Sequence, residues 1–322
     1  MNRNKIVIVV IIMFMSLLAK AQHSQILINK CFMFIEDNNI VEFDNTYPNL
    51  FTEFLKENIP QYKQALSFLK DEKYEEAVAN LESLVMEGYF IDEIKYDTNF
   101  VILHSLESWK NLLNKIQIII DSYQNQIRLV LKDIQNKDQS IRILYMAALK
   151  KYESSSNIPA IVHNLMKKID DNSAEIVMKI VDTHGWLGAD AIGEEANQTL
   201  FLAIQHADDL IVQEKYLPLL TDAVKNENAE PWHLAFLTDR ILMNQGKKQI
   251  YGTQIIKSNN NPENSYVVPL QNPDNVDILR TSIGLDSLKE YLEEEGIEWN
   301  LDKYKEDLPR IEKLYKERFE KQ

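Results

Sequence analysis

The chain has 322 residues, of which 35 are Lys or Arg and 49 are Asp or Glu, so its formal net charge is −14 at pH 7. This charge argues against nucleic acid and anionic membrane as bulk partners, since both are bound through clustered basic side chains. Hydrophobic residues make up 45% of the chain and charged residues 26%, which excludes wholesale disorder.

The first 21 residues have the pattern of a secretory signal peptide. Two basic residues precede the run 6–19, which is apolar except for Ser16, and an A-K-A cleavage sequence ends at Ala21. This run is shorter than the ~20 apolar residues that a membrane-spanning helix needs. We therefore expect an exported protein, periplasmic or extracellular, that is cleaved after Ala21 and keeps no integral membrane anchor. Cleavage leaves 32 basic against 49 acidic residues, a net charge of −17.

Residues 60–88 have the pattern of a helical hairpin. Two apolar runs, each with the i, i+3, i+4, i+7 spacing of an amphipathic helix, flank the polar turn 70–73. The stretch resembles one tetratricopeptide repeat. A single repeat cannot bury its own apolar face, so we expect residues 31–56 and 96–109 to cap it. Such a hairpin can bind a protein or peptide partner in its groove, or it can pack against the next domain, and both interpretations stay open.

Residues 109–135 contain no glycine or proline, and their apolar residues recur at alternating three- and four-residue steps. This pattern predicts one long helix that joins two domains stiffly. The expected fold class is mainly α. The expected organisation is a signal peptide (1–21), a tetratricopeptide-like helical region (22–108), a connecting helix (109–136) and a C-terminal helical domain with a small β-hairpin (137–322).

The second half of the chain carries recognisable helix ends. Asn172 and Glu175 have the spacing of a capping box and predict a helix start. Gly185 stands where that helix should end. Gly193 precedes two acidic residues that suit the positive end of a helix dipole, so the next helix should begin there.

Further elements follow in order along the chain. They are predicted at 210–225 and 230–245 (helices) and at 249–256 and 265–270 (the two strands of a hairpin). Pro218 should kink or break the first of these helices, because proline removes a backbone hydrogen bond. Two or three helices should finish the chain, one of them capped by Asp286.

The sequence lacks the fingerprints of common catalytic and cofactor sites. It contains no G-x-G-x-x-G, G-x-S-x-G, H-E-x-x-H or C-x-x-C motif. Gly188 and Gly193 have the spacing of a phosphate loop, but the two glutamates that follow would repel phosphate. A metal site would have to draw three ligands from His184, His206, His233 and nearby acids, which form no close pair. We therefore expect neither a cofactor nor a metal.

Several polar residues fall in apolar helical patterns, where they should point inward. Asp239 and Arg240 lie in a helix that is apolar nearly all round, and a buried charge costs on the order of several kcal/mol unless it is paired. Sequence neighbours do not face each other on a helix, so each needs a partner elsewhere, such as Arg142 or Arg280 for Asp239. Gln213 begins an apolar stripe in the same way. These residues form either a buried structural network or a site that faces a substrate.

Seven motifs, taken together, resemble a known family. They are KDQSIR (Asp138, Gln139, Arg142), GWLGADAIGEEA (with Trp186), QHAD (with His206), Gln213 itself, TDR (Asp239, Arg240), QIYGTQ (Tyr251, Thr253, Gln254) and RTSIGL (Arg280). Over about residues 124–295 the chain resembles a bacterial family catalogued as domain of unknown function 6624. That family has no established activity, so the resemblance implies a domain and a candidate pocket but no reaction.

The resemblance groups the inward-pointing polar residues into one candidate site. Its candidate binding residues are Asp138, Gln139, Arg142, Trp186, Gln213, Tyr251, Thr253, Gln254 and Arg280. One hypothesis is an exported hydrolase in which His206 is the general base, Asp239 orients it, and Arg240 and Gln254 hold a polar or anionic substrate.

The hydrolase hypothesis lacks an evident nucleophile. Thr253 and Tyr251 are candidates without an activating base, so water would have to attack the substrate. A second hypothesis is a non-catalytic binding or scaffolding module that meets a protein partner through the helical hairpin. A third is that the polar set is purely structural. The sequence leaves open whether the protein is an enzyme.

Overall fold

The computed structural model describes residues 22–153, 155–257 and 265–319. These residues are mainly α-helical, with one small antiparallel pair of strands near the C-terminus, as the sequence predicted. The expected signal peptide and the predicted hairpin turn at 258–264 lie outside the described residues. No helix in the described ranges is long and apolar enough to cross a membrane.

The described residues form two compact units. The N-terminal unit comprises residues 22–153, 155–169 and 187–199, and the C-terminal unit comprises residues 170–186, 200–257 and 265–319. Two helices, α9 (Ile158–His184) and α11 (Glu194–His206), contribute residues to both units.

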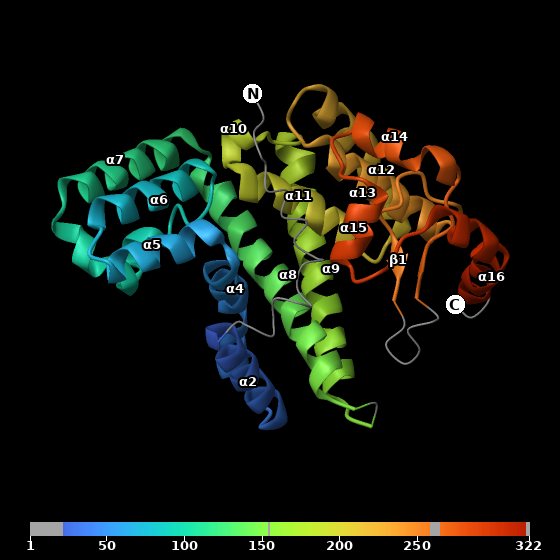
Figure 1. Ribbon diagram of the computed structural model, residues 1–322, viewed down its shortest axis with the longest axis horizontal. Helices are drawn as coiled ribbons and strands as arrows, with labels where there is room; N and C mark the ends of the chain where they lie inside the picture. The colour runs from blue at the N-terminus through green and yellow to red at the C-terminus, as the bar shows by residue number, and fades with distance from the viewer. Residues whose placement is uncertain (1–21, 154, 258–264, 320–322) are drawn as a thin grey trace. The chain divides into compact units, whose positions relative to one another are not determined.

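The N-terminal unit is otherwise built from helices that follow one another along the chain. They are α2 (Gln22–Glu36), α3 (Ile40–Thr46), η1 (Tyr47–Asn49), α4 (Leu50–Asn58), α5 (Pro60–Lys70), α6 (Tyr74–Met86), η2 (Ile94–Tyr96), η3 (Thr98–Ser105), α7 (Glu107–Ser122), α8 (Asn125–Lys151) and α10 (Ala189–Ile192). Helices α5 and α6 pack as a hairpin, and α7 lies beside α6 (Figure 1). Ala65 and Ala77 are fully buried in this hairpin, where their small side chains let the helices approach closely.

Residues after the hairpin close against it through a buried polar cluster. The Tyr62 hydroxyl donates to Asp97 over 2.6 Å, and the Lys56 ammonium lies 3.0 Å from the same carboxylate. Asn99 donates its backbone N–H to Asp97 over 3.0 Å. Phe100 follows into the core, with its ring centroid 5.5 Å from that of Tyr62. The segment that begins at Asp97 therefore covers α5, as expected of a cap.

The single connecting helix predicted over 109–135 is in fact two helices, α7 and α8. Tyr123 is extended between them, with φ −96° and ψ 157°. The N–H of Gln124 donates to the Ala191 carbonyl over 2.8 Å. This bond comes from a segment far along the chain, so the local pattern could not predict the break. Helix α8 then runs to Lys151, beyond the expected end of the connecting helix.

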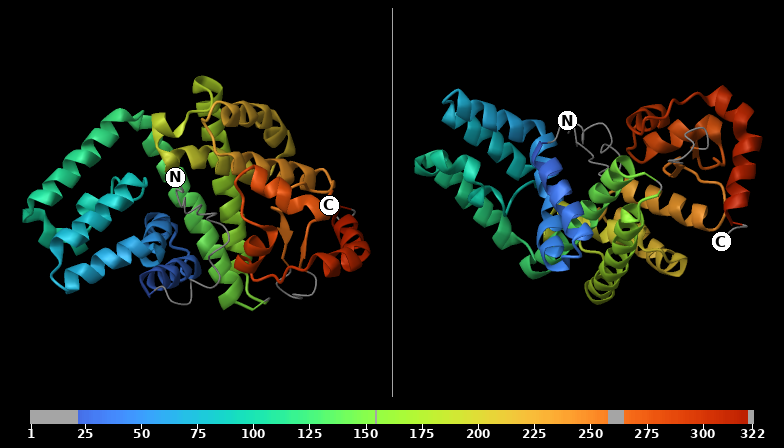
Figure 2. Two further views of the ribbon diagram at one scale, coloured as in Figure 1. Left: turned by 45° about the horizontal axis from the view of Figure 1, so that its top comes forward. Right: turned by 90° about the horizontal axis from the view of Figure 1, so that it is seen from below.

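The C-terminal unit holds the remaining helices and both strands. They are α12 (Leu210–Lys225), α13 (Pro231–Asn244), β1 (Ile255–Ile256), β2 (Tyr266–Val267), η5 (Pro273–Asn275), α14 (Val276–Ser282), α15 (Leu288–Glu294) and α16 (Leu301–Phe319). Helices α12 and α13 pack together (Figures 1 and 2). Strands β1 and β2 are antiparallel, with Ile255 opposite Val267 and Ile256 opposite Tyr266.

Three predicted helix features were wrong in detail. No helix starts at Asn172, because α9 continues through it and Glu175 bonds forward to Lys179 over 2.6 Å. The predicted break at Pro218 is absent, because α12 continues through it from Leu210 to Lys225 and packs on α13. The cap of α15 is Ser287, not Asp286, and Ser287 forms a complete capping box with Glu290. The stop at Gly185 is confirmed, and this glycine has φ +73°.

Candidate functional site

In the C-terminal unit, the predicted residue Asp239 is the centre of a closed polar network. It lies on α13 and is fully buried, with 0% of its surface exposed. Oδ1 accepts the N–H of Ile250 over 2.7 Å, and Oδ2 accepts the N–H of Thr253 over 3.0 Å. The Thr253 hydroxyl also donates to Oδ2 over 3.0 Å, and the N–H of Tyr251 lies 3.2 and 3.1 Å from the two oxygens. The carboxylate therefore organises the loop that follows α13.

Burial and hydrogen bonding act in opposite directions on the pKa of Asp239. Burial is the larger influence and raises the pKa above its usual value, and the hydrogen bonds from Thr253, Ile250 and Tyr251 offset part of that rise. A backbone N–H can only donate, so both oxygens of Asp239 must act as acceptors. Hydrogen bonds of this kind replace the water that an ionised carboxylate loses on burial.

A second layer of bonds fixes the same loop from outside. Gln249 acts as a substitute for backbone: its Oε1 accepts the N–H of Gln254 over 2.8 Å, and its Nε2 donates to the carbonyls of Gln254 and Val268 over 3.0 and 2.7 Å. The Gln254 Nε2 donates to the Thr253 hydroxyl over 2.9 Å. Gln249, Thr253 and Gln254 are all buried, so the network is largely shielded from water.

Arg280 binds the outer side of this loop and not Asp239. Its Nη1 donates to the Tyr251 carbonyl over 2.8 Å and its Nε to the Asp286 carbonyl over 2.6 Å. The guanidinium carbon lies 4.8 Å from the centroid of the Tyr291 ring, and the Tyr291 hydroxyl donates to the Thr253 carbonyl over 2.9 Å. Arg280 and Tyr291 thus satisfy carbonyls of the loop whose N–H groups bind Asp239.

Gly252 is required at the tip of this loop for steric reasons. It has φ +72°, a conformation that side chains rarely adopt, and a Cβ built there would lie 2.9 Å from Leu288. The group nearest to this position is the Leu288 side chain.

Gln213, the other inward-pointing residue of the C-terminal unit, joins three helix ends. Its Nε2 donates to the carbonyls of Ala207 and Gln205 over 2.8 and 3.3 Å, and its Oε1 accepts from Asn244 over 2.9 Å. These bonds tie the end of α11 to α12 and α13. His206 is the last residue of α11 and is half-buried.

The remaining candidates of the C-terminal unit are Trp186 and Arg240. Trp186 is buried, and its indole N–H has no hydrogen-bond partner among the described residues. Arg240 is half-buried and lies next to the fully buried Asp239 on α13.

In the N-terminal unit, the predicted residues Asp138, Gln139 and Arg142 form one turn of α8. The Arg142 guanidinium lies 2.9 Å from the Asp138 carboxylate, one helical turn away, and the Gln139 Nε2 donates to Asp138 over 2.5 Å. Gln139 is fully buried, and its Oε1 has no hydrogen-bond partner within the described residues. Arg142 therefore pairs with Asp138 and not, as predicted, with Asp239.

The structure brings some of the predicted site residues together, but it does not support the roles that were proposed for others. Tyr251, Thr253, Gln254 and Arg280 meet around the Asp239 loop. Asp239 does not orient His206, because among the described residues its carboxylate bonds only to residues 250–253. Sequence reasoning missed Tyr291, which no local pattern marks, and it quoted Gln249 in a motif without giving it a role.

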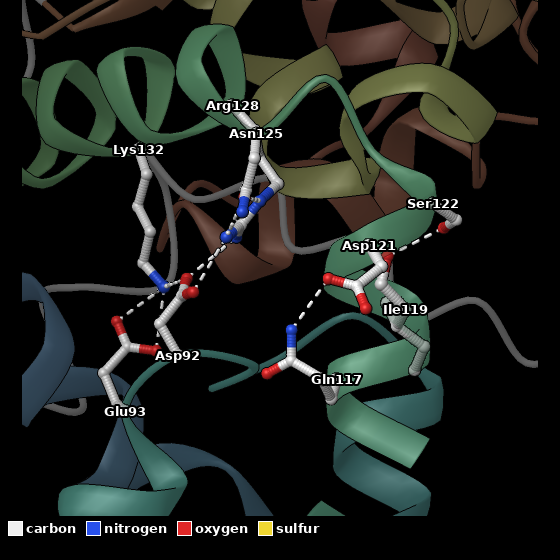
Figure 3. A network of polar contacts seen from close by, with 9 residues as sticks. All are labelled: Asp92, Glu93, Gln117, Ile119, Asp121, Ser122, Asn125, Arg128 and Lys132. Carbon is white, nitrogen blue, oxygen red and sulfur yellow. Dashed lines mark hydrogen bonds and ion pairs between the residues drawn. The ribbon is translucent and has the colours of Figure 1, made fainter. Parts of the chain in front are cut away.

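A charged cluster in the N-terminal unit was also missed. The Arg128 Nη1 and Nη2 each lie 2.8 Å from an oxygen of Asp92, and the Lys132 ammonium lies 2.7 Å from both Asp92 and Glu93 (Figure 3). Asn125 accepts two hydrogen bonds from Arg128 (Figure 3). The pKa of Asp92 is lowered well below its usual range, because the two cations outweigh its burial. An i, i+4 basic pair on α8 is the only sequence signal of this cluster.

The two units and their buried networks define a mainly α-helical protein of two parts. The chain belongs to a family of unknown function (DUF6624), whose model matches residues 126–299, as the seven motifs indicated. The matched range includes Arg128, Lys132 and the whole Asp239 network. No curated protein and no solved structure matches this chain.

Proposed function

We propose that this protein is an exported, non-catalytic binding module that holds a peptide segment of a partner protein on its N-terminal unit. The proposal rests on one observation above others: the candidate catalytic acid, Asp239, is fully buried and its oxygens are filled by donors from its own loop. The candidate nucleophile Thr253 is buried too, and its hydroxyl is bonded to Asp239 and Gln254. Asp239 and Thr253 therefore serve to build the loop.

Exposed apolar side chains support a binding surface after the helical hairpin. In η3, Phe100 and Leu103 are buried, whereas Val101 and Ile102 between them are each 56% exposed. Tyr96, just before η3, is 75% exposed. Large apolar side chains left in water at such a density are typical of surfaces that bind another protein.

Charge indicates the chemistry of the partner. The expected mature chain carries a net charge of −17, which would attract a basic segment and repel an acidic one. We therefore expect a peptide with apolar anchor residues flanked by Lys or Arg. Export is supported by the pattern of the first 21 residues.

A peptide panel tests this function. The chain from Gln22 onward is titrated against peptides that differ in apolar content and charge, and binding is followed by fluorescence anisotropy. The double variant Val101→Ser/Ile102→Ser should weaken the best peptide by about tenfold or more, because two apolar anchors worth about 1 kcal/mol each are lost. The matched control is Ile211→Ser, which removes an apolar side chain that is 76% exposed in the C-terminal unit.

The same preparation is screened for hydrolysis of peptides, esters and glycans. We expect no turnover. Equal binding by the double variant and the wild type would overturn the binding surface. Turnover that is lost in His206→Ala would restore the hydrolase hypothesis.

A further inference from the structure

Two side chains that can bind a metal ion come together in the C-terminal unit. A carboxylate oxygen of Asp170 and an imidazole nitrogen of His206 lie within 4.8 Å of each other. Asp170 belongs to α9 and His206 is the last residue of α11, so tertiary packing and not local sequence makes this pair. The carboxylate beside His206 is therefore that of Asp170 and not, as the sequence suggested, that of Asp239.

The two side chains differ in exposure in a way that suits a ligand site. Asp170 is 7% exposed, so packing holds its carboxylate in place. His206 is half-buried, which gives the pair a route to solvent. A cation that enters by this route can keep water on its remaining coordination positions.

Hydrogen bonds fix the end of α11 that carries His206. Gln213 donates to the carbonyls on both sides of it, those of Gln205 and Ala207, over 3.3 and 2.8 Å. The imidazole is thus mounted on an anchored backbone, so less conformational entropy is lost when a ligand binds. In the same turn, the side-chain Oε1 of Gln205 is buried and has no hydrogen-bond partner among the described residues. A water molecule bound to a metal ion is a donor of the kind that this acceptor lacks.

The types of ligand select the class of cation. A nitrogen of imidazole together with a carboxylate oxygen suits zinc and other divalent transition metals, whereas Mg²⁺ and Ca²⁺ prefer oxygen ligands alone. Two ligands of one zinc ion, each about 2.0–2.2 Å from it, lie about 3–3.5 Å apart, so a small rotation of the side chains brings this pair to chelating distance.

We infer that Asp170 and His206 hold a divalent transition-metal ion that ties the end of α11 to α9 within the C-terminal unit. Asp170 supplies a carboxylate oxygen, His206 supplies a neutral imidazole nitrogen, and water completes the coordination. This site is independent of the peptide-binding surface proposed on η3, so each can be tested without the other.

Zinc binding by the full mature chain tests this inference. Titration calorimetry measures the stoichiometry and affinity, and thermal unfolding measures the stabilisation, because an ion that binds the folded chain raises the midpoint of unfolding. We expect one equivalent of Zn²⁺ to bind and to raise the midpoint. The same concentration of Mg²⁺ should leave the midpoint unchanged.

Two variants with matched controls locate the ion. His206→Ala and Asp170→Asn should each weaken zinc binding about tenfold or more. The controls are His184→Ala, which removes the exposed histidine at the end of α9, and Asp171→Asn, which changes the exposed neighbour of Asp170. Both controls should bind zinc as the wild type does.

Four results would overturn the inference. They are a wild type that binds no zinc, zinc binding that survives His206→Ala, zinc binding that the two controls lose equally, and stabilisation by Mg²⁺ as large as that by Zn²⁺. If Asp170→Asn does not fold, the comparison of His206→Ala with His184→Ala decides alone, because neither histidine is buried.

Discussion

Replacement of Asp239 should be among the most damaging single changes in the C-terminal unit. In Asp239→Ala, three backbone N–H groups and the Thr253 hydroxyl lose their acceptor inside the protein. Each bond to a charged group contributes about 1.5–3 kcal/mol, but the loop relaxes and water enters, so the bonds are not additive. We expect a loss of about 3–5 kcal/mol in the free energy of unfolding, since each buried donor left without an acceptor costs about 1–3 kcal/mol.

Asp239→Asn makes the test sharper, because it preserves the size of the side chain. One oxygen becomes an NH₂ group that faces N–H donors, whichever way the amide is turned. The expected loss is about 2–4 kcal/mol, smaller than for alanine because one acceptor remains. The matched control is Asp222→Asn on α12, where the carboxylate is exposed and pairs with Lys225 over 3.3 Å.

Urea unfolding, followed by tryptophan fluorescence, gives these free energies. Trp232 lies on α13 with Asp239 and reports on the C-terminal unit. The control should unfold as the wild type does. A loss below about 1 kcal/mol for Asp239→Ala would refute the reasoning, since it would mean that water already satisfies the loop.

Three further predictions concern other parts of the chain. Gly252→Ala should cost about 2 kcal/mol or more in thermal unfolding, because the new Cβ meets Leu288 at 2.9 Å and φ is +72°; an unchanged midpoint would contradict this contact. Tyr62→Phe should cost about 1–2 kcal/mol in urea unfolding, because the buried Asp97 loses a donor at 2.6 Å; a neutral substitution would show that water replaces it. The Cys31 thiol should resist an aromatic disulfide reagent at pH 8 until the chain is denatured, because burial raises its pKa to about 12; rapid reaction of the folded chain would refute this.

Helix ends that depend on local chemistry could be predicted from the sequence. Pro231 begins α13 and Gly246, with φ +70°, follows its end, because proline suits the first turn of a helix and glycine adopts a positive φ without strain. Gly185 ends α9 for the same reason. The break at Tyr123 could not be predicted, since it depends on a hydrogen bond to Ala191 that the local sequence does not contain.

For the polar residues, the sequence predicts which side chains are buried but not which groups they bind. The inward direction of Asp239 and Gln213 follows from helical spacing alone, and both are buried. Their partners are backbone groups, which every residue carries and no side-chain pattern reveals. A search among charged side chains therefore proposed Arg142 and Arg280 for Asp239, whereas the actual donors are the N–H groups of its own loop and one hydroxyl.

The most direct test of the proposed function compares two variants in the same peptide-binding assay. The account predicts that Val101→Ser/Ile102→Ser, changed on the exposed face of η3, loses binding, whereas Asp239→Asn, assayed at a temperature at which it is folded, binds as the wild type does. It also predicts no hydrolysis by any of the three proteins. The opposite pattern, a folded Asp239→Asn that loses binding or turnover while the η3 variant keeps it, would contradict the account and return Asp239 to a functional site.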